Sequence, residues 1–154
     1  MDNDKKVKIG CASAFWGDTT TAAKQLVEKG DINYLVFDFL AEVTMSILAG
    51  AKNKSKDMGY ATDFIKQLAP LLDQVKKKNI KVISNAGGIN LNDCRNALMN
   101  EAEKAKIDLK IAIVTGDDLM KKLPKLIELG IKETETSEPL PDSCLSINAY
   151  LGAP

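Results

Sequence analysis

Apolar and polar positions follow two different periods along this chain. Short apolar, β-branched runs predict buried strands at residues 7–12, 34–37, 81–84 and 109–114. Between these runs, apolar residues recur three and four positions apart, which predicts helices at residues 19–29, 39–52, 61–78, 91–106 and 119–129. Strands that alternate with helices indicate an α/β fold with a parallel sheet and right-handed crossovers.

The pattern predicts a parallel sheet of four or more strands in βα repeats, arranged in three layers in a Rossmann-like fold. A part of a β/α barrel is the alternative. An additional helix follows the second strand, and Pro70 is expected to kink or restart the long helix at 61–78, because proline lacks the N–H of the helical ladder. Asp18 and Asn90 are placed to cap the helices that follow them.

Residues 1–130 are expected to form the α/β domain, and residues 131–154 an extended tail. The tail contains Pro139 and Pro141, and its apolar run from Leu145 to Ala153 stops at Pro154. We expect this run to be the start of a continuation of the same domain that the chain lacks. One edge of the sheet and residues 147–151 would then either be exposed or be covered by a second copy in a homo-oligomer formed through the sheet edge or the tail.

Composition excludes several classes of function. Lys and Arg (21) balance Asp and Glu (21) in the 154 residues, and no segment forms a basic patch for nucleic acid. The chain has no histidine, and its three cysteines lack metal-type spacing, which argues against zinc or a histidine-based triad, and no residue is assigned as a metal ligand. Unpaired cysteines, no leader pattern and no long apolar run predict a cytoplasmic protein without a membrane partner.

Polar and glycine residues gather where the predicted strands end. The carboxyl ends of parallel strands share one edge, so these residues are expected to converge on a small-molecule site. The candidates for ligand binding are Ser13, Trp16, Gly17, Asp18, Ser84, Asn85, Gly87, Gly88, Thr115 and Gly116. The alternative is that βα loops are polar because they form turns and caps, and for Asp18, Asn90 and Asp117 taken singly capping is favoured.

Three carboxylates are the candidates for catalysis. Asp38 and Glu42 are four residues apart and would share one face of a helix, where one of them could act as a general acid. Complementing the helix dipole is the favoured alternative for this pair. Asp117 follows the fourth predicted strand. At the central turn, Gly87 and Gly88 either form a backbone cradle for a ligand or only make a tight turn, and the two readings carry equal weight.

Several long motifs in the same order resemble the acyclic terpene utilisation family, the AtuA-like proteins. The matching stretches are residues 13–18, 34–45, 59–64, 85–88 (NAGG), 114–118 (VTGDD), 138–140 and 146–153. The resemblance implies a role in the breakdown of acyclic terpenes such as citronellol and geraniol, which proceeds through coenzyme A thioesters. It names a pathway and not a reaction, and it assigns no cofactor, since a coenzyme A thioester would be a substrate.

Family members are longer, so the resemblance implies that this chain corresponds to their front portion. Relatives are richer in glycine where this chain has Cys11 and Ala14, which would narrow access of a ligand to the first loop. Two hypotheses follow. The first is an enzyme, or the front of one, that binds a small acyl or acyl-CoA ligand at the carboxyl edge of the sheet. The second is a noncatalytic binding or assembly module, or an inactive fragment.

Overall fold

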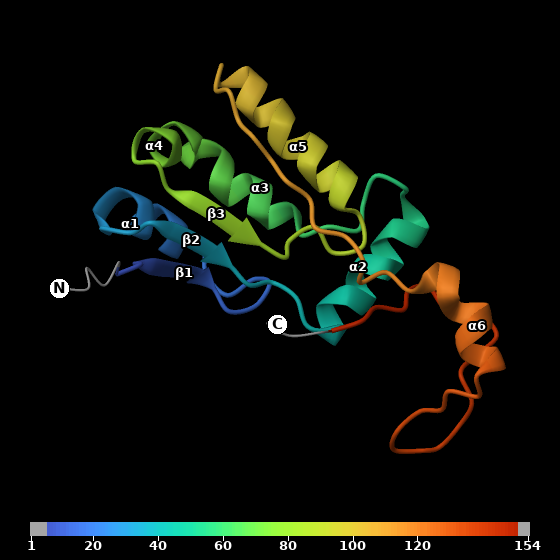
Figure 1. Ribbon diagram of the computed structural model, residues 1–154. Helices are drawn as coiled ribbons and strands as arrows, with labels where there is room; N and C mark the ends of the chain where they lie inside the picture. Colours follow the sequence, from blue (N-terminus) through green and yellow to red (C-terminus); the bar gives the residue numbers. More distant parts are fainter. Residues whose placement is uncertain (1–5, 151–154) are drawn as a thin grey trace. The chain divides into compact units, whose positions relative to one another are not determined.

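A computed structural model describes residues 6–150 of the chain, and Figure 1 shows the order of its elements. Three strands, β1 (Ile9–Ser13), β2 (Tyr34–Phe37) and β3 (Lys81–Ser84), form a parallel sheet in the order β1-β2-β3. The central strand is therefore β2, in which Tyr34 pairs with Ile9 on one side and Lys81 on the other. The predicted α/β class and the parallel direction of the sheet are confirmed.

Helices connect the three strands and also follow the last of them. In chain order they are α1 (Ala22–Lys29), α2 (Glu42–Lys54), α3 (Thr62–Leu68), η1 (Ala69–Leu71), α4 (Leu72–Lys77), α5 (Leu91–Lys104), η2 (Met120–Lys122) and α6 (Leu123–Glu128). The long helix predicted at 61–78 is divided by the 3-10 turn η1 that contains Pro70. The expected restart at this proline is confirmed.

The chain forms two compact units, Met1–Ile113 and Val114–Pro154. This boundary lies nearer the amino terminus than the one at residue 130 suggested by the sequence. In the first unit, helices pack on one face of the sheet. The Phe37 ring of β2 lies at the centre of this core, 5.6 Å from the ring of Phe39 and 5.2 Å from that of Phe64 in α3. Burial of each such side chain stabilises the fold by roughly 1.5–3 kcal/mol.

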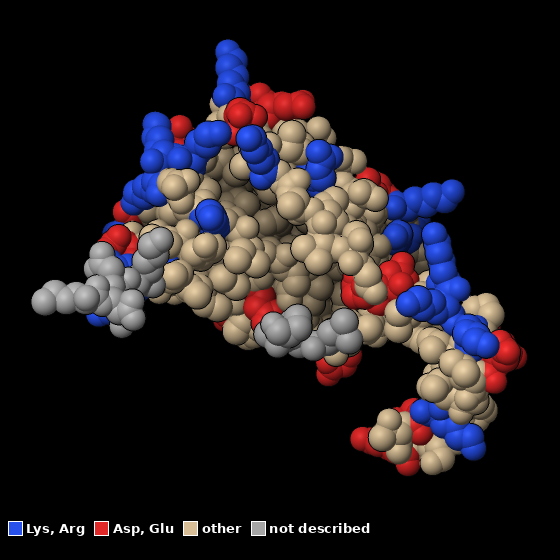
Figure 2. Space-filling view, viewed as in Figure 1, with Lys and Arg blue, Asp and Glu red and all other residues tan. Residues whose placement is uncertain are grey.

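The opposite face of the sheet carries apolar side chains that no helix covers. Ile9 of β1 is 65% exposed and Ile83 of β3 is 54% exposed. Parallel sheets are ordinarily covered on both faces, so an open face is unusual. Figure 2 shows mainly uncharged atoms over the strands, with basic atoms among them, while most other Lys, Arg, Asp and Glu side chains lie towards the rim of this view. We call this surface the open sheet face, and its residues are Ile9, Cys11, Tyr34, Val36, Lys81 and Ile83.

The predicted fourth strand at 109–114 is not confirmed. Leu109 and Ile111 pack against the core of the first unit, but the segment forms no strand with the rest of the described chain. Alternating burial suits a strand, yet strand formation also requires a hydrogen-bonded neighbour. The four-stranded sheet and the three-layer arrangement therefore stay predictions, and so does the barrel alternative.

In the second unit, backbone hydrogen bonds join the start of the unit to its end. The Leu119 N–H donates to the Ile147 carbonyl at 2.8 Å, and the Ala149 N–H donates to the Asp117 carbonyl at 2.8 Å. Between residues 131 and 150 the chain is largely irregular, as its prolines predicted. The last part of the predicted apolar run, residues 151–154, lies outside the described residues.

Candidate functional site

The carboxyl edge of the sheet brings together the ends of β2 and β3. The Asn85 side chain, just after β3, accepts a hydrogen bond from the Phe39 N–H at 2.8 Å through its Oδ1. Its Nδ2 donates to Asp38 Oδ1 at 2.7 Å. Asn85 thus fixes the turn that follows β2 and holds one oxygen of the Asp38 carboxylate. Both side chains are exposed, so the second carboxylate oxygen is accessible to a ligand.

The end of β1 reaches the same edge through Ser13. The Asp38 N–H donates to the Ser13 carbonyl at 3.2 Å, and the buried Ser13 hydroxyl donates to the Asp38 carbonyl at 3.4 Å. Because this hydroxyl is buried and already engaged with the backbone, it serves the join between β1 and β2. The structure therefore places Ser13, Asp38 and Asn85 together, as the strand pattern predicted.

The loop after β1 is held to α3 and does not start a helix. Trp16 Nε1 donates to Asp63 Oδ2 at 2.9 Å, and Asp18 Oδ2 accepts the Ala14 N–H at 2.9 Å. The expected capping of a helix at residue 19 by Asp18 is wrong, because α1 begins only at Ala22 and Asp18 closes a turn instead. Gly17 is exposed in this turn with a φ of 95°.

The central glycine turn is closed by its own backbone. The Gly88 N–H donates to the Asn85 carbonyl at 3.2 Å, the Ile89 N–H to the Gly59 carbonyl at 3.0 Å, and the Asn90 N–H to the Gly87 carbonyl at 2.9 Å. These N–H groups are thus engaged within the fold. The Ser84 hydroxyl accepts the Ala86 N–H at 3.0 Å in the same turn. The geometry gives the two glycines a packing role, and ligand binding by this turn stays a prediction.

Two further expectations about helix starts are corrected. Asp38 precedes α2, which begins at Glu42, so the two carboxylates do not share a helix face. Asn90 occupies the cap position of α5, but its side chain makes no capping hydrogen bond. Its Nδ2 instead donates to the carbonyls of Lys56 and Met58 at 3.1 and 2.8 Å, which ties the loop before α3 to the central turn.

The remaining predicted residues lie in the second unit. Thr115 and Gly116 are exposed, and the Asp117 side chain accepts a hydrogen bond from Asn148 Nδ2 at 3.2 Å. The neighbouring Asp118 accepts the Met120 N–H at 2.9 Å, just before η2, whose cap position is occupied by Leu119. The hydrogen bond between Asn148 and Asp117 joins two of the motifs that carried the resemblance, at 114–118 and 146–153.

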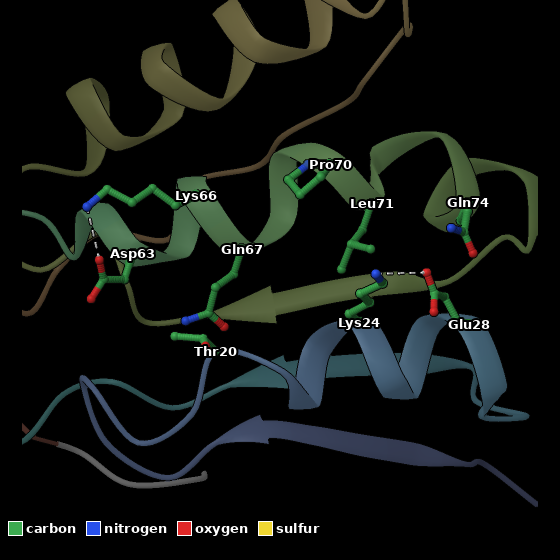
Figure 3. A pocket seen from close by; sticks show the side chains of 9 residues that line it. All are labelled: Thr20, Lys24, Glu28, Asp63, Lys66, Gln67, Pro70, Leu71 and Gln74. Atoms are coloured by element: carbon green, nitrogen blue, oxygen red, sulfur yellow. Dashed lines mark hydrogen bonds and ion pairs between the residues drawn. The ribbon is translucent and has the colours of Figure 1, made fainter.

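A groove of about 500 Å³ lies on the helical side of the first unit, between α1 and the α3–η1–α4 stretch (Figure 3). Each wall carries an ion pair within one helix: Lys24 Nζ lies 3.9 Å from Glu28 Oε1, and Lys66 Nζ lies 3.3 Å from Asp63 Oδ1. These pairs are exposed to solvent and each contributes about 0.3–0.5 kcal/mol. The groove is therefore lined by balanced charge, which does not favour an anionic over a cationic ligand.

Sequence reasoning missed this groove. Gln67 points into the space between the two walls, near Thr20. Its Oε1 is buried and has no hydrogen-bond partner among the described residues. The signal that could have indicated Gln67 is its polar side chain within the apolar spacing of Phe64, Leu68 and Leu71, where an apolar residue is expected.

Neither metal binding nor an activated thiol is indicated by the side-chain geometry. In residues 6–150, no group of three or more Cys, Asp or Glu side chains is placed to hold a metal ion. Burial raises the pKa of the Cys94 thiol to about 11, so this group stays protonated near neutral pH. The pKa of the nearby Tyr60 hydroxyl is also raised, first by burial and then by the charge of Cys94 and of nearby carboxylates.

The fold and the carboxyl edge of the sheet define the class of protein. It is an α/β protein with a parallel sheet, at whose carboxyl edge the Asn85 amide positions the Asp38 carboxylate. The family model described as acyclic terpene utilisation family protein AtuA matches residues 7–154, and the chain belongs to this family. The resemblance found in the sequence is thereby confirmed. No curated protein and no solved structure matches the chain. Within residues 6–150, every helix is too short or too polar to cross a bilayer.

Proposed function

We propose that the chain binds a small acyl or acyl-CoA ligand at the carboxyl edge of its sheet, as a component of acyclic terpene catabolism. The observation that carries this proposal is the hydrogen bond from Asn85 to Asp38, which positions an exposed carboxylate where strands β2 and β3 end. Membership of the acyclic terpene utilisation family supports the pathway. Ligands of open parallel sheets bind at this edge.

The roles follow from the accessible groups. Asp38 is the acid-base candidate, because one of its oxygens is held by Asn85 and the other faces solvent. Glu42, exposed at the start of α2, is the second candidate and is close along the chain. Asp117 belongs to the second unit and enters this proposal only as a predicted residue. The reaction and any cofactor are left unassigned.

The test compares Asp38, which follows β2 in the sequence, with Asp31, an exposed aspartate that precedes β2. Thermal unfolding is recorded with free coenzyme A, with a branched acyl-CoA and with the matching free acid. A ligand at about 100 times its dissociation constant adds about 2.7 kcal/mol, which raises the melting temperature by several degrees. We expect this rise with the acyl-CoA in the wild type and in Asp31→Asn, and its loss in Asp38→Asn.

The control is matched because, among the described residues, the Asp31 side chain contacts a charged partner only in an exposed ion pair with Lys8, and exposed pairs contribute little to stability. A melting temperature that none of the ligands changes would contradict the proposal. An equal rise in both variants would move the ligand away from Asp38. A rise with free coenzyme A alone would reassign the ligand from the acyl group to the nucleotide part.

The alternative, a noncatalytic binding or assembly module, is favoured by one observation, the open sheet face with its exposed Ile9 and Ile83. We also propose a cytoplasmic location, because Cys11, Cys94 and Cys144 are all unpaired. A homo-oligomer formed through the sheet edge or the tail stays a prediction from the sequence.

A further inference from the structure

The open sheet face carries a lysine that lies over an aromatic ring and has no ion pair with the described residues. Lys81 begins β3, and its Nζ lies 5.6 Å from the centroid of the Tyr34 ring on the same face. In the part of the chain that the structure describes, no carboxylate forms an ion pair with Lys81. Next to it, Val36 and Ile83 continue an apolar surface across the strands. The face thus offers apolar contact with one positive charge at its amino-terminal end.

Helix α2 carries the complementary surface on the same unit. Val43, Ile47 and Gly50 are spaced by four and three residues, so they lie on one side of the helix. Val43 is 65% exposed and Ile47 is 56% exposed. A Cβ at Gly50 would meet nothing within 4 Å, so another surface can approach the helix closely there. Glu42 is exposed in the first turn of α2, to one side of this stripe, and forms no ion pair with the described residues.

The two surfaces match in length and in charge. The 13 residues of α2 span about 20 Å as a helix, and the five residues of β1 span about 16 Å as a strand. When α2 lies along the strands in the same direction, its stripe covers the rows that contain Ile9 and Ile83. Its amino-terminal end then falls over the amino-terminal end of β3, where Glu42 meets Lys81.

We propose that a second copy of this chain covers the open sheet face with its α2 helix, and that the two copies form this contact twice in a closed dimer. Two-fold symmetry makes the same pair of surfaces meet on both sides, whereas a one-way contact would extend into open chains of copies. Burial of the exposed apolar residues supplies the affinity, and the pair formed by Glu42 and Lys81 sets the direction of the helix. This proposal does not depend on the acyl ligand.

The test measures the oligomeric state of the full chain by sedimentation velocity over about a hundredfold range of concentration. We expect a concentration-dependent dimer. A charge placed in the apolar contact, in Ile83→Glu or Ile47→Glu, is expected to raise the dissociation constant by about 100-fold. The control Leu129→Glu, at an exposed apolar residue of the second unit, is expected to leave the dissociation constant unchanged.

Charge exchange tests the orientation of the helix. Lys81→Glu alone and Glu42→Lys alone are each expected to weaken the dimer about tenfold, and the double variant is expected to regain most of the wild-type affinity. Far-ultraviolet circular dichroism verifies that each variant is folded. A monomer at every concentration, open-ended oligomers, a dimer that Ile83→Glu leaves intact, or a double variant no stronger than the single ones would overturn the proposal. The monomer result would assign the face to a different protein.

Discussion

At the residue scale, Asn85 connects the chemistry of the edge to the fold. The Asn85 side-chain amide accepts a hydrogen bond from the Phe39 N–H after β2 and donates one to an oxygen of the Asp38 carboxylate. A single residue therefore holds both the turn and the carboxylate. Because this bond lies at an exposed edge, it orients the carboxylate and adds little to the stability of the fold. The sequence placed both residues at one edge because parallel strands end together. It did not reveal their contact, which depends on the turn between them.

Cys94 gives a prediction about pH at the same scale. Burial raises the pKa of its thiol from the ordinary 9.0 to about 11 in the folded chain. Below about pH 9 the thiol is protonated in both states, so stability does not depend on it. Between about pH 9 and 11 only the unfolded chain releases the proton. The free energy of unfolding is therefore expected to fall by about 2 kcal/mol as pH rises through this window.

Urea unfolding of the wild type and of Cys94→Ala at pH 7, 9 and 10.5 measures this effect. The variant is expected to be less stable at pH 7, because it loses buried volume, and to show a smaller fall on the alkaline side. Tyr60 titrates in both proteins, but its pKa is raised partly by the charge of Cys94, so part of the difference between the two proteins comes from Tyr60. An equal fall in both proteins would show that another group is responsible.

At the scale of the elements, the apolar runs predicted three strands within about two residues at each end, because a short β-branched run admits few registers. The helix starts were predicted less well. Asp18 and Asn90 have side chains suited to capping, but both bind elsewhere in the fold. The open sheet face could not be predicted either, since an apolar strand does not reveal whether a helix covers its second face.

Gly88 and Gly17 provide a matched test of the βα turns. Both have positive φ, of 52° and 95°. A Cβ at Gly88 would lie 2.5 Å from Leu48 Cδ1 and 2.7 Å from the Gly59 carbonyl oxygen, whereas one at Gly17 would meet nothing within 4 Å. We expect Gly88→Ala to cost about 3 kcal/mol, from strain and overpacking together, and Gly17→Ala about 1 kcal/mol from backbone strain alone.

Urea unfolding of the two alanine variants decides between packing and open access at the central turn. A Gly88 variant no less stable than the Gly17 variant would contradict the packing role. That result would favour the alternative that the central turn binds a ligand through its backbone, since there would then be room for an approaching group.

At the scale of the whole molecule, the chain consists of two units that are stabilised by different interactions. The first unit contains the hydrophobic cluster, whose buried members run from Ala12 to Ala102. The second unit has one buried large apolar residue among those described, Leu123, and is held mainly by backbone hydrogen bonds between residues 117–119 and 147–149. The sequence suggested a boundary at residue 130, because the helix pattern continues to residue 129. An apolar helix side does not show whether that helix packs into the core of the first unit.

Limited proteolysis tests this division. Val114 is 87% exposed, and Thr115 and Gly116 beside it are exposed as well. Exposed segments with few contacts are preferred sites of cleavage. Elastase, which cuts after small apolar residues, is therefore expected to cleave first near Val114, and mass spectrometry should identify a fragment that ends there. Because the fragment retains the whole hydrophobic cluster, it should unfold cooperatively on heating. First cuts within residues 6–113, or a fragment that melts without a transition, would contradict the conclusion that the first unit folds independently.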